Sequence, residues 1–112
     1  MRPLLLLGAL SLAASLPAAA QARRTFTGVV TDSMCATTAG HSRMQMGPTD
    51  ADCTTACVDA HGATYMLFDG KTAYALSDQR TPAQFPGQKV RVTGVLDAKT
   101  KTITVASIKP AK

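Results

Sequence analysis

The chain of 112 residues contains no tryptophan, no glutamate and no asparagine, and it has only two tyrosines and three phenylalanines. Without glutamate or asparagine, a nucleophilic cysteine–histidine pair would have only aspartate to orient its histidine, which disfavours that kind of catalysis. The sequence also lacks a glycine-rich phosphate-binding loop. Its basic C-terminal segment contains no aromatic side chain on which bases would stack. These absences predict that the protein is not an enzyme and binds no nucleic acid.

The first 20 residues have the features of a secretory signal. Arg2 provides a positive charge, residues 4–16 are mostly apolar, and small residues up to Ala22 offer a cleavage site. Cleavage after Ala20 and cleavage after Ala22 agree equally well with the pattern. The apolar stretch is too short to span a bilayer comfortably, so we expect no membrane span in the mature chain. A periplasmic or secreted location follows from this interpretation.

Residues 21–112 are expected to form a single domain, because so short a chain leaves no room for a second core. The whole chain carries a formal net charge of +5, and this charge is unevenly distributed. The segment from residue 88 onward is basic, whereas residues 32–61 are mainly acidic. A basic strand pair would attract an anionic partner, but lysines on an exposed sheet face also keep a small β-domain soluble. We expect a monomer whose partner is unknown.

The mature chain is predicted to be mainly β. Asp69-Gly70 between two β-prone runs predicts a hairpin. Gly94 interrupts the alternation of its run, as a bulge or a barrel corner would. The five expected strands are Thr25–Thr31, Thr64–Phe68, Thr72–Leu76, Lys89–Leu96 and Thr102–Ile108.

One helix is expected between the first and the second strand. Thr49 is a good N-cap, and Gly62 is a good residue to follow the last turn. The helix is therefore predicted over residues Asp50–His61. Cys53 and Cys57 are four residues apart, so they share one helical face. This face should bring both sulfur atoms towards whatever follows the first strand.

Three segments resemble those of a known group of proteins: Phe26–Cys35, Asp52–Val58 and Lys89–Leu96. They are similar to an uncharacterised family of small exported bacterial proteins with an OB-like domain. The resemblance covers nearly all of the mature chain, and it implies a fold and export rather than an activity. Together with the strand pattern it predicts a small five-stranded OB-like Greek-key barrel with one short helix in an insertion over residues 33–62.

The insertion concentrates the side chains that suit soft metal ions. Thiolates and thioethers favour Cu(I), and a Cys₃His set would suit zinc in a tetrahedral site. Copper or zinc is therefore the expected ion. The candidate ligands are Cys35, His41, Met44, Met46, Cys53 and Cys57.

A disulfide bond is the alternative for the same cysteines, because exported proteins meet oxidising conditions. Cys35 would pair with Cys57 or with Cys53. Such a bridge would close a loop of roughly 20 residues and contribute about 3 kcal/mol to stability. The sequence thus predicts a small binding module of the cell envelope with a soft-metal site, or else a disulfide-stapled interaction domain that binds a protein or an anionic partner.

Overall fold

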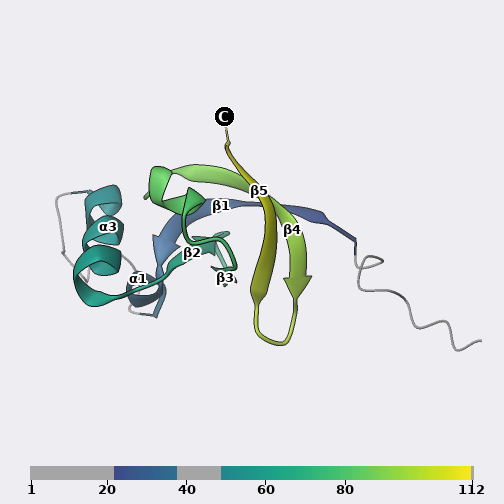
Figure 1. Ribbon diagram of the computed structural model, residues 1–112, viewed down its shortest axis with the longest axis horizontal. Helices are drawn as coiled ribbons and strands as arrows, with labels where there is room; N and C mark the ends of the chain where they lie inside the picture. Colours follow the sequence, from purple (N-terminus) through teal and green to yellow (C-terminus); the bar gives the residue numbers. More distant parts are fainter. Residues whose placement is uncertain (1–21, 38–48, 112) are drawn as a thin grey trace, which may run out of the picture.

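Five strands close into a barrel in the computed structural model of this protein, which describes residues 22–37 and 49–111 (Figure 1). They are hydrogen-bonded in the order β1-β2-β3-β5-β4, with β1 also paired to β4. Every pair is antiparallel except β3 with β5. This mainly β barrel confirms the predicted fold class, and its strand order is consistent with an OB-like barrel. The strands are β1 (Arg24–Asp32), β2 (Tyr65–Phe68), β3 (Ala73–Leu76), β4 (Lys89–Asp97) and β5 (Thr102–Pro110).

β1 pairs with two neighbours, and its inner face begins the barrel core. Residues up to Val29 pair with β4, and residues from Val29 onward pair with β2. Gly28 lies at this change of partner, where a side chain would collide with the backbone of Phe68. Phe26 and Val30 lie on the same face and are buried. The other strands contribute the remaining buried core residues, which are Tyr65, Leu67, Leu76, Val90, Val92, Ile103 and Ile108.

Gly94 interrupts the pairing of β4 with β5, as predicted. The register shifts between Thr93 and Gly94, which leaves Ala106 of β5 as the extra residue of a bulge. A Cβ atom on Gly94 would meet the backbone carbonyl oxygen of Thr104. The close approach of the two strands here therefore requires a residue without a side chain.

The described part of the insertion contains two helices, so the prediction of one short helix is wrong in number. α3 (Asp50–His61) has the predicted bounds, because Thr49 accepts a hydrogen bond from the Asp52 amide at 3.1 Å and Gly62 ends the helix at φ 67°. The additional helix, α1 (Ser33–Thr37), follows β1 directly. No helix in the described part of the chain is long and apolar enough to cross a membrane.

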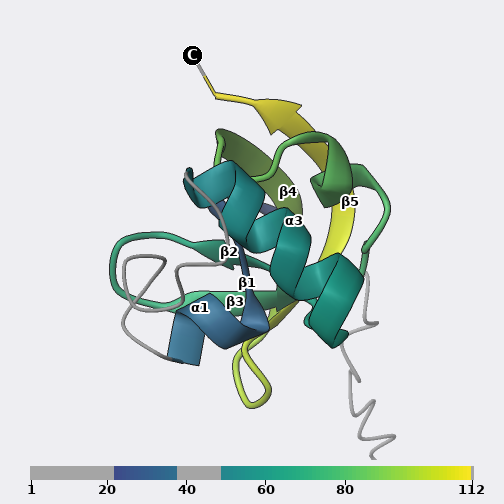
Figure 2. The ribbon, with the colours of Figure 1, turned by 90° about the vertical axis from the view of Figure 1, so that its left-hand side faces the viewer.

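α3 lies across one end of the barrel, with α1 beside it (Figure 2). Val58 of α3 packs against the barrel core. At the start of α3, a Cβ atom on Gly87 would meet the Ala51 nitrogen at 2.7 Å, so helix and barrel touch here through their backbones. The turn η2 (Thr81–Gln84) joins β3 to β4 and leads into Phe85, which packs half-buried against the core. These contacts hold α3 in place and thereby fix the positions of its cysteines.

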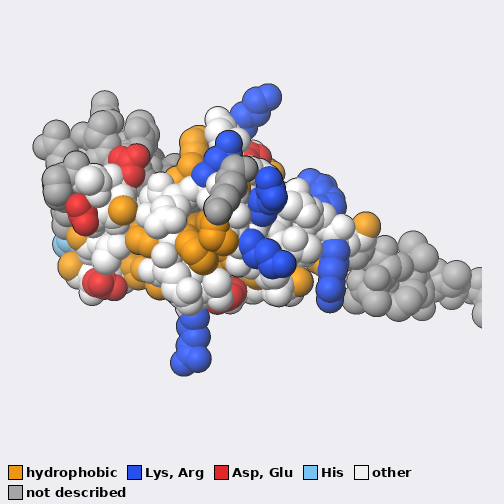
Figure 3. Space-filling model, turned by 90° about the horizontal axis from the view of Figure 1, so that it is seen from above, with side chains coloured by type: hydrophobic (Ala, Val, Ile, Leu, Met, Phe, Trp, Pro, Cys, Tyr) orange, Lys and Arg blue, Asp and Glu red, His pale blue; other side chains and the backbone are white. Residues whose placement is uncertain are grey.

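Charged side chains of opposite sign lie on different parts of the surface. In Figure 3, lysine and arginine side chains gather over the strands, and aspartate side chains gather at the end that α3 covers. α3 carries Asp50, Asp52 and Asp59 and no lysine or arginine. β4, in contrast, exposes Lys89 and Arg91.

Candidate metal centre

Cys53 and Cys57 lie one turn apart on the buried face of α3. Their spacing of four residues places both side chains on the same side of the helix. Only 1% of Cys53 and 0% of Cys57 is exposed to solvent, whereas Asp52 and Asp59 on the other face are exposed. The sequence pattern of α3 therefore directs two thiols into the protein and its carboxylates into water.

Asp32, the last residue of β1, positions the third cysteine. Its Oδ2 atom accepts hydrogen bonds from the backbone amides of Met34 (3.0 Å) and Cys35 (3.1 Å), as an N-cap aspartate does for a helix. Ser33 and Thr64 form a second connection, because the Ser33 amide donates to the Thr64 carbonyl oxygen (2.9 Å) and Ser33 Oγ accepts from the Thr64 amide (3.0 Å). α1 is thus held both to β1 and to the residue before β2.

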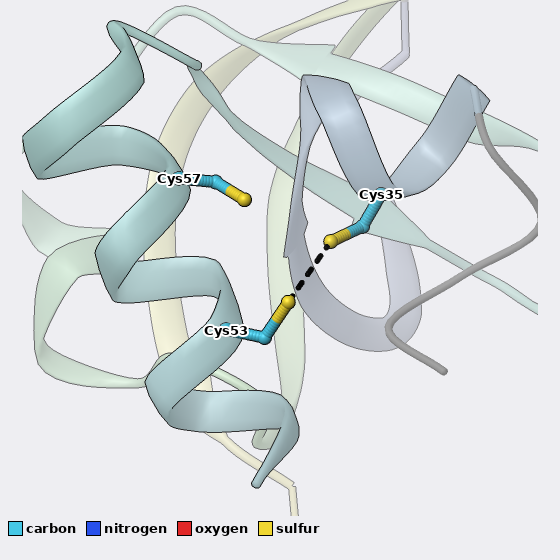
Figure 4. Close-up of side chains that lie close together, drawn as sticks. All are labelled: Cys35, Cys53 and Cys57. Carbon is cyan, nitrogen blue, oxygen red and sulfur yellow. Dashed lines mark hydrogen bonds between the residues drawn. The ribbon is translucent and has the colours of Figure 1, made fainter. Parts of the chain in front are cut away.

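The three cysteine sulfur atoms converge between α1 and α3. All three Sγ atoms lie within 4.8 Å of one another, and those of Cys35 and Cys53 are 3.6 Å apart. Cys35 points from α1 towards the two cysteines of α3 (Figure 4). All cysteines of the chain are among the described residues, and each is a free thiol, so the expected bridge from Cys35 to Cys57 or Cys53 is not formed in this structure.

The surroundings of the thiols favour their protonated form. Burial raises the pKa of Cys35 and of Cys57 above the ordinary value of 9.0, and the nearby Asp32 carboxylate raises both pKa values further. The pKa of Tyr65, which faces Asp32 across the β1–β2 pair, is raised by burial and then by Asp59 and Asp32. The main causes of these three shifts include no basic side chain. The site therefore keeps its thiols neutral beside the Asp32 carboxylate.

The free energy of unfolding of the metal-free protein is expected to fall as the pH rises above about 9. Thiols of the unfolded chain lose their protons near 9.0, whereas Cys35 and Cys57, whose pKa values are raised in the folded state, keep theirs. The unfolded state then binds fewer protons, so each of these thiols lowers the stability by at most about 1.4 kcal/mol per pH unit. Urea unfolding curves between about pH 8 and about pH 11 measure this slope.

The double variant Cys35→Ala/Cys57→Ala is the control for this pH dependence, because it removes both thiols whose pKa is raised. We expect a flatter dependence of its stability on pH, whatever its stability at neutral pH. An unchanged slope in the double variant would show that other groups cause the alkaline loss of stability.

The structure brings together three of the six predicted metal ligands. Cys35, Cys53 and Cys57 meet as expected. The other three, His41, Met44 and Met46, lie outside the described residues, so their participation stays a prediction.

Asp32 is the residue at this site that sequence reasoning missed. The signal for it is an aspartate at a strand end, three residues before Cys35, which is the spacing of an N-cap to the third residue of a helix. Within the part of the chain that the structure describes, two buried side-chain oxygen atoms lack a hydrogen-bond partner: Oδ1 of Asp32, and Oγ1 of Thr54 on α3.

Comparisons with known proteins identify no activity. The sequence signature of a family described as "Protein of unknown function (DUF5818)" matches residues 60–111. This segment contains β2 to β5 and only the last two residues of α3, so the three cysteines lie outside it. No curated protein and no solved structure matches the chain significantly. The match supports the predicted relationship to an uncharacterised family, whereas bacterial origin and export stay predictions.

Proposed function

We propose that this protein is an exported, non-enzymatic binding module of the cell envelope that holds one soft or borderline metal ion, Cu(I) or Zn(II), through three cysteine thiolates. The observation that carries the proposal is the convergence of the Cys35, Cys53 and Cys57 sulfur atoms within 4.8 Å. Export is supported by the signal-like composition of the first 20 residues.

The spacing of the sulfur atoms agrees with that of a thiolate metal centre. Sulfur atoms that bind one zinc ion at 2.3 Å in a tetrahedral arrangement lie about 3.8 Å apart. The Cys35 and Cys53 sulfur atoms are already 3.6 Å apart, and Cys57 completes the triangle within 4.8 Å. Small side-chain rotations would therefore suffice to bring all three sulfur atoms to one ion.

Burial of the cysteines favours retention of a bound ion. None of the three side chains has more than 2% of its surface exposed. A metal ion between them would be shielded from water, and it would replace the thiol protons that burial and Asp32 now help to retain. Binding should therefore release protons and stabilise the docking of α3 against α1.

Elemental analysis of the chain purified from the periplasm, without added metal or chelator, tests this proposal. We expect about one copper or zinc ion per chain in the wild type. Each of the variants Cys35→Ser, Cys53→Ser and Cys57→Ser removes one thiolate and should reduce the bound metal to about a tenth or less. The matched control is His61→Ala, which removes an exposed histidine four residues after Cys57 and should retain the ion. Equal metal content in all five proteins would contradict the proposal.

A disulfide-stapled domain that binds a protein or an anionic partner is the second candidate. It is favoured by the close approach of the Cys35 and Cys53 sulfur atoms, which would leave Cys57 as a free thiol after oxidation. Thiol counting on the unfolded periplasmic protein distinguishes the two candidates. Three thiols together with bound metal support the metal centre, whereas one thiol without metal supports the disulfide.

A further inference from the structure

The Asp32 carboxylate has an unusual environment. Its side chain is 0% exposed, and its Oδ1 atom has no hydrogen-bond partner among the described residues. Its Oδ2 atom accepts hydrogen bonds from the amides of Met34 and Cys35. Buried carboxylates in proteins are normally paired with a cation or fully hydrogen-bonded. The capping of α1 thus accounts for the hydrogen bonds of Oδ2, whereas no described residue donates a hydrogen bond to Oδ1.

Asp32 lies beside the thiols of both helices. Its carboxylate acts electrostatically on Cys35 of α1 and on Cys57 of α3. The backbone amides of Met34 and Cys35 donate to it, and the Cys35 thiol lies within hydrogen-bond reach of it. No lysine, arginine or histidine side chain donates to it among the described residues. Asp32 is therefore a buried carboxylate beside the three-thiol group, in contact with the residue that supplies one of its sulfur atoms.

We propose that Asp32 makes the three-thiol centre selective for a divalent ion of the zinc class over Cu(I), by adding a carboxylate charge and an oxygen donor to the site. This inference rests on the metal centre proposed above. Zinc binds sulfur, nitrogen and oxygen ligands and takes four of them in structural sites. Cu(I) instead selects soft sulfur ligands and gains little from a carboxylate. Three thiols and one carboxylate form a donor set that matches zinc.

The charge of Asp32 favours a divalent ion even without direct coordination. The attraction between the carboxylate and a bound ion is proportional to the charge of the ion. Loss of the carboxylate charge should therefore lower the logarithm of the association constant about twice as much for Zn(II) as for Cu(I). Loss of an oxygen ligand would increase the difference further, because only Zn(II) uses that ligand.

Asp32→Asn tests the proposal because it removes the charge and retains an oxygen atom that can accept the two amide hydrogen bonds capping α1. The matched control is Thr54→Val, which removes another unpartnered buried oxygen, on α3 next to Cys53 in sequence, without changing the charge. Affinities of the wild type and both variants for Zn(II) and for Cu(I) are measured anaerobically by competition with chromophoric chelators. Circular dichroism shows whether each variant is folded.

We expect Asp32→Asn to lower the Zn(II) affinity about 100-fold and the Cu(I) affinity about 10-fold or less, whereas Thr54→Val leaves both within about threefold. An equal loss for both ions, or an unchanged Zn(II) affinity in folded Asp32→Asn, would overturn the role of Asp32. A wild type that binds neither ion would instead refute the proposed metal centre, so the two failures are distinguishable.

A second measurement needs no variant and covers the case in which Asp32→Asn does not fold. The carboxylate stretching bands of wild-type protein labelled with ¹³C-aspartate are recorded by infrared difference spectroscopy on addition of each ion. We expect Zn(II) to shift an aspartate band and Cu(I) to leave it nearly unchanged. The same band shift with both ions, or no shift with Zn(II), would contradict the proposal.

Discussion

Zinc at a thousandfold excess over its dissociation constant is expected to raise the free energy of unfolding of this protein by about 4 kcal/mol. The three candidate ligand thiols come from two helices that are far apart in the unfolded chain, so only the folded protein brings them together. For a domain of this size, 4 kcal/mol corresponds to an increase of roughly 15–30 °C in the unfolding temperature. Thermal unfolding followed by circular dichroism, with and without zinc, measures the increase.

The triple variant Cys35→Ser/Cys53→Ser/Cys57→Ser is the control for this stabilisation, because it keeps the size of the side chains and removes every thiol. Its unfolding temperature should not respond to zinc, and a chelator should return the wild type to its metal-free value. An equally large increase in the triple variant would place the stabilising zinc ion elsewhere on the protein.

Gly94→Ala is expected to lower the free energy of unfolding by about 3 kcal/mol. A Cβ atom at this position would meet the Thr104 carbonyl oxygen and would lie 2.8 Å from Cγ2 of Ile103, a core residue with no exposed surface. Backbone on one side and a packed core on the other leave the methyl group no room. β4 and β5 would have to separate at the bulge. The midpoint of urea-induced unfolding, with the slope held constant, measures the loss.

Gly62→Ala is the matched control, because the same methyl group there meets nothing within 4 Å. Gly62 has φ 67°, so an alanine would suffer only the strain of the left-handed conformation, about 1 kcal/mol. Equal destabilisation by the two substitutions would mean that the close approach at Gly94 has no special energetic importance.

Local signals in the sequence predict the elements of the fold well. Thr49 and Gly62 mark the ends of α3, because capping is decided by hydrogen bonds within a few residues. Asp69-Gly70 predicts the β2–β3 hairpin for the same reason, since Asp69 Oδ1 accepts hydrogen bonds from the two residues that close the loop, Lys71 and Thr72. Features that depend on short-range geometry can therefore be predicted from the sequence.

α1 was not predicted because its stability comes from distant partners. Five residues are too few to form a helix on their own propensity. The helix exists because Asp32 caps it and because Ser33 is connected to Thr64 on the far side of the insertion. The Asp32 cap is a local contact with a local signal, whereas the connection of Ser33 to Thr64 is established only when the barrel has closed. No local pattern reveals that second contact.

The candidate site was predicted in part for the same physical reasons. The spacing of Cys53 and Cys57 on one helix is a local property, and it correctly predicts that both thiols share a face. Asp32 is the first residue of the acidic segment 32–61, and its amino-acid type alone does not distinguish a buried aspartate from an exposed one. Its burial results from the packing of α1 and α3 around the end of β1.

The separation of charged side chains gives the folded molecule an electric dipole. Its negative end is the end covered by α3 (Figure 3). This helix carries Asp50, Asp52 and Asp59 together with two of the three cysteines. A small cation near the protein would therefore be favoured at the end with α3 over the basic strands, and an anionic surface would be favoured at the opposite side. Added salt screens this long-range electrostatic attraction without altering the site itself.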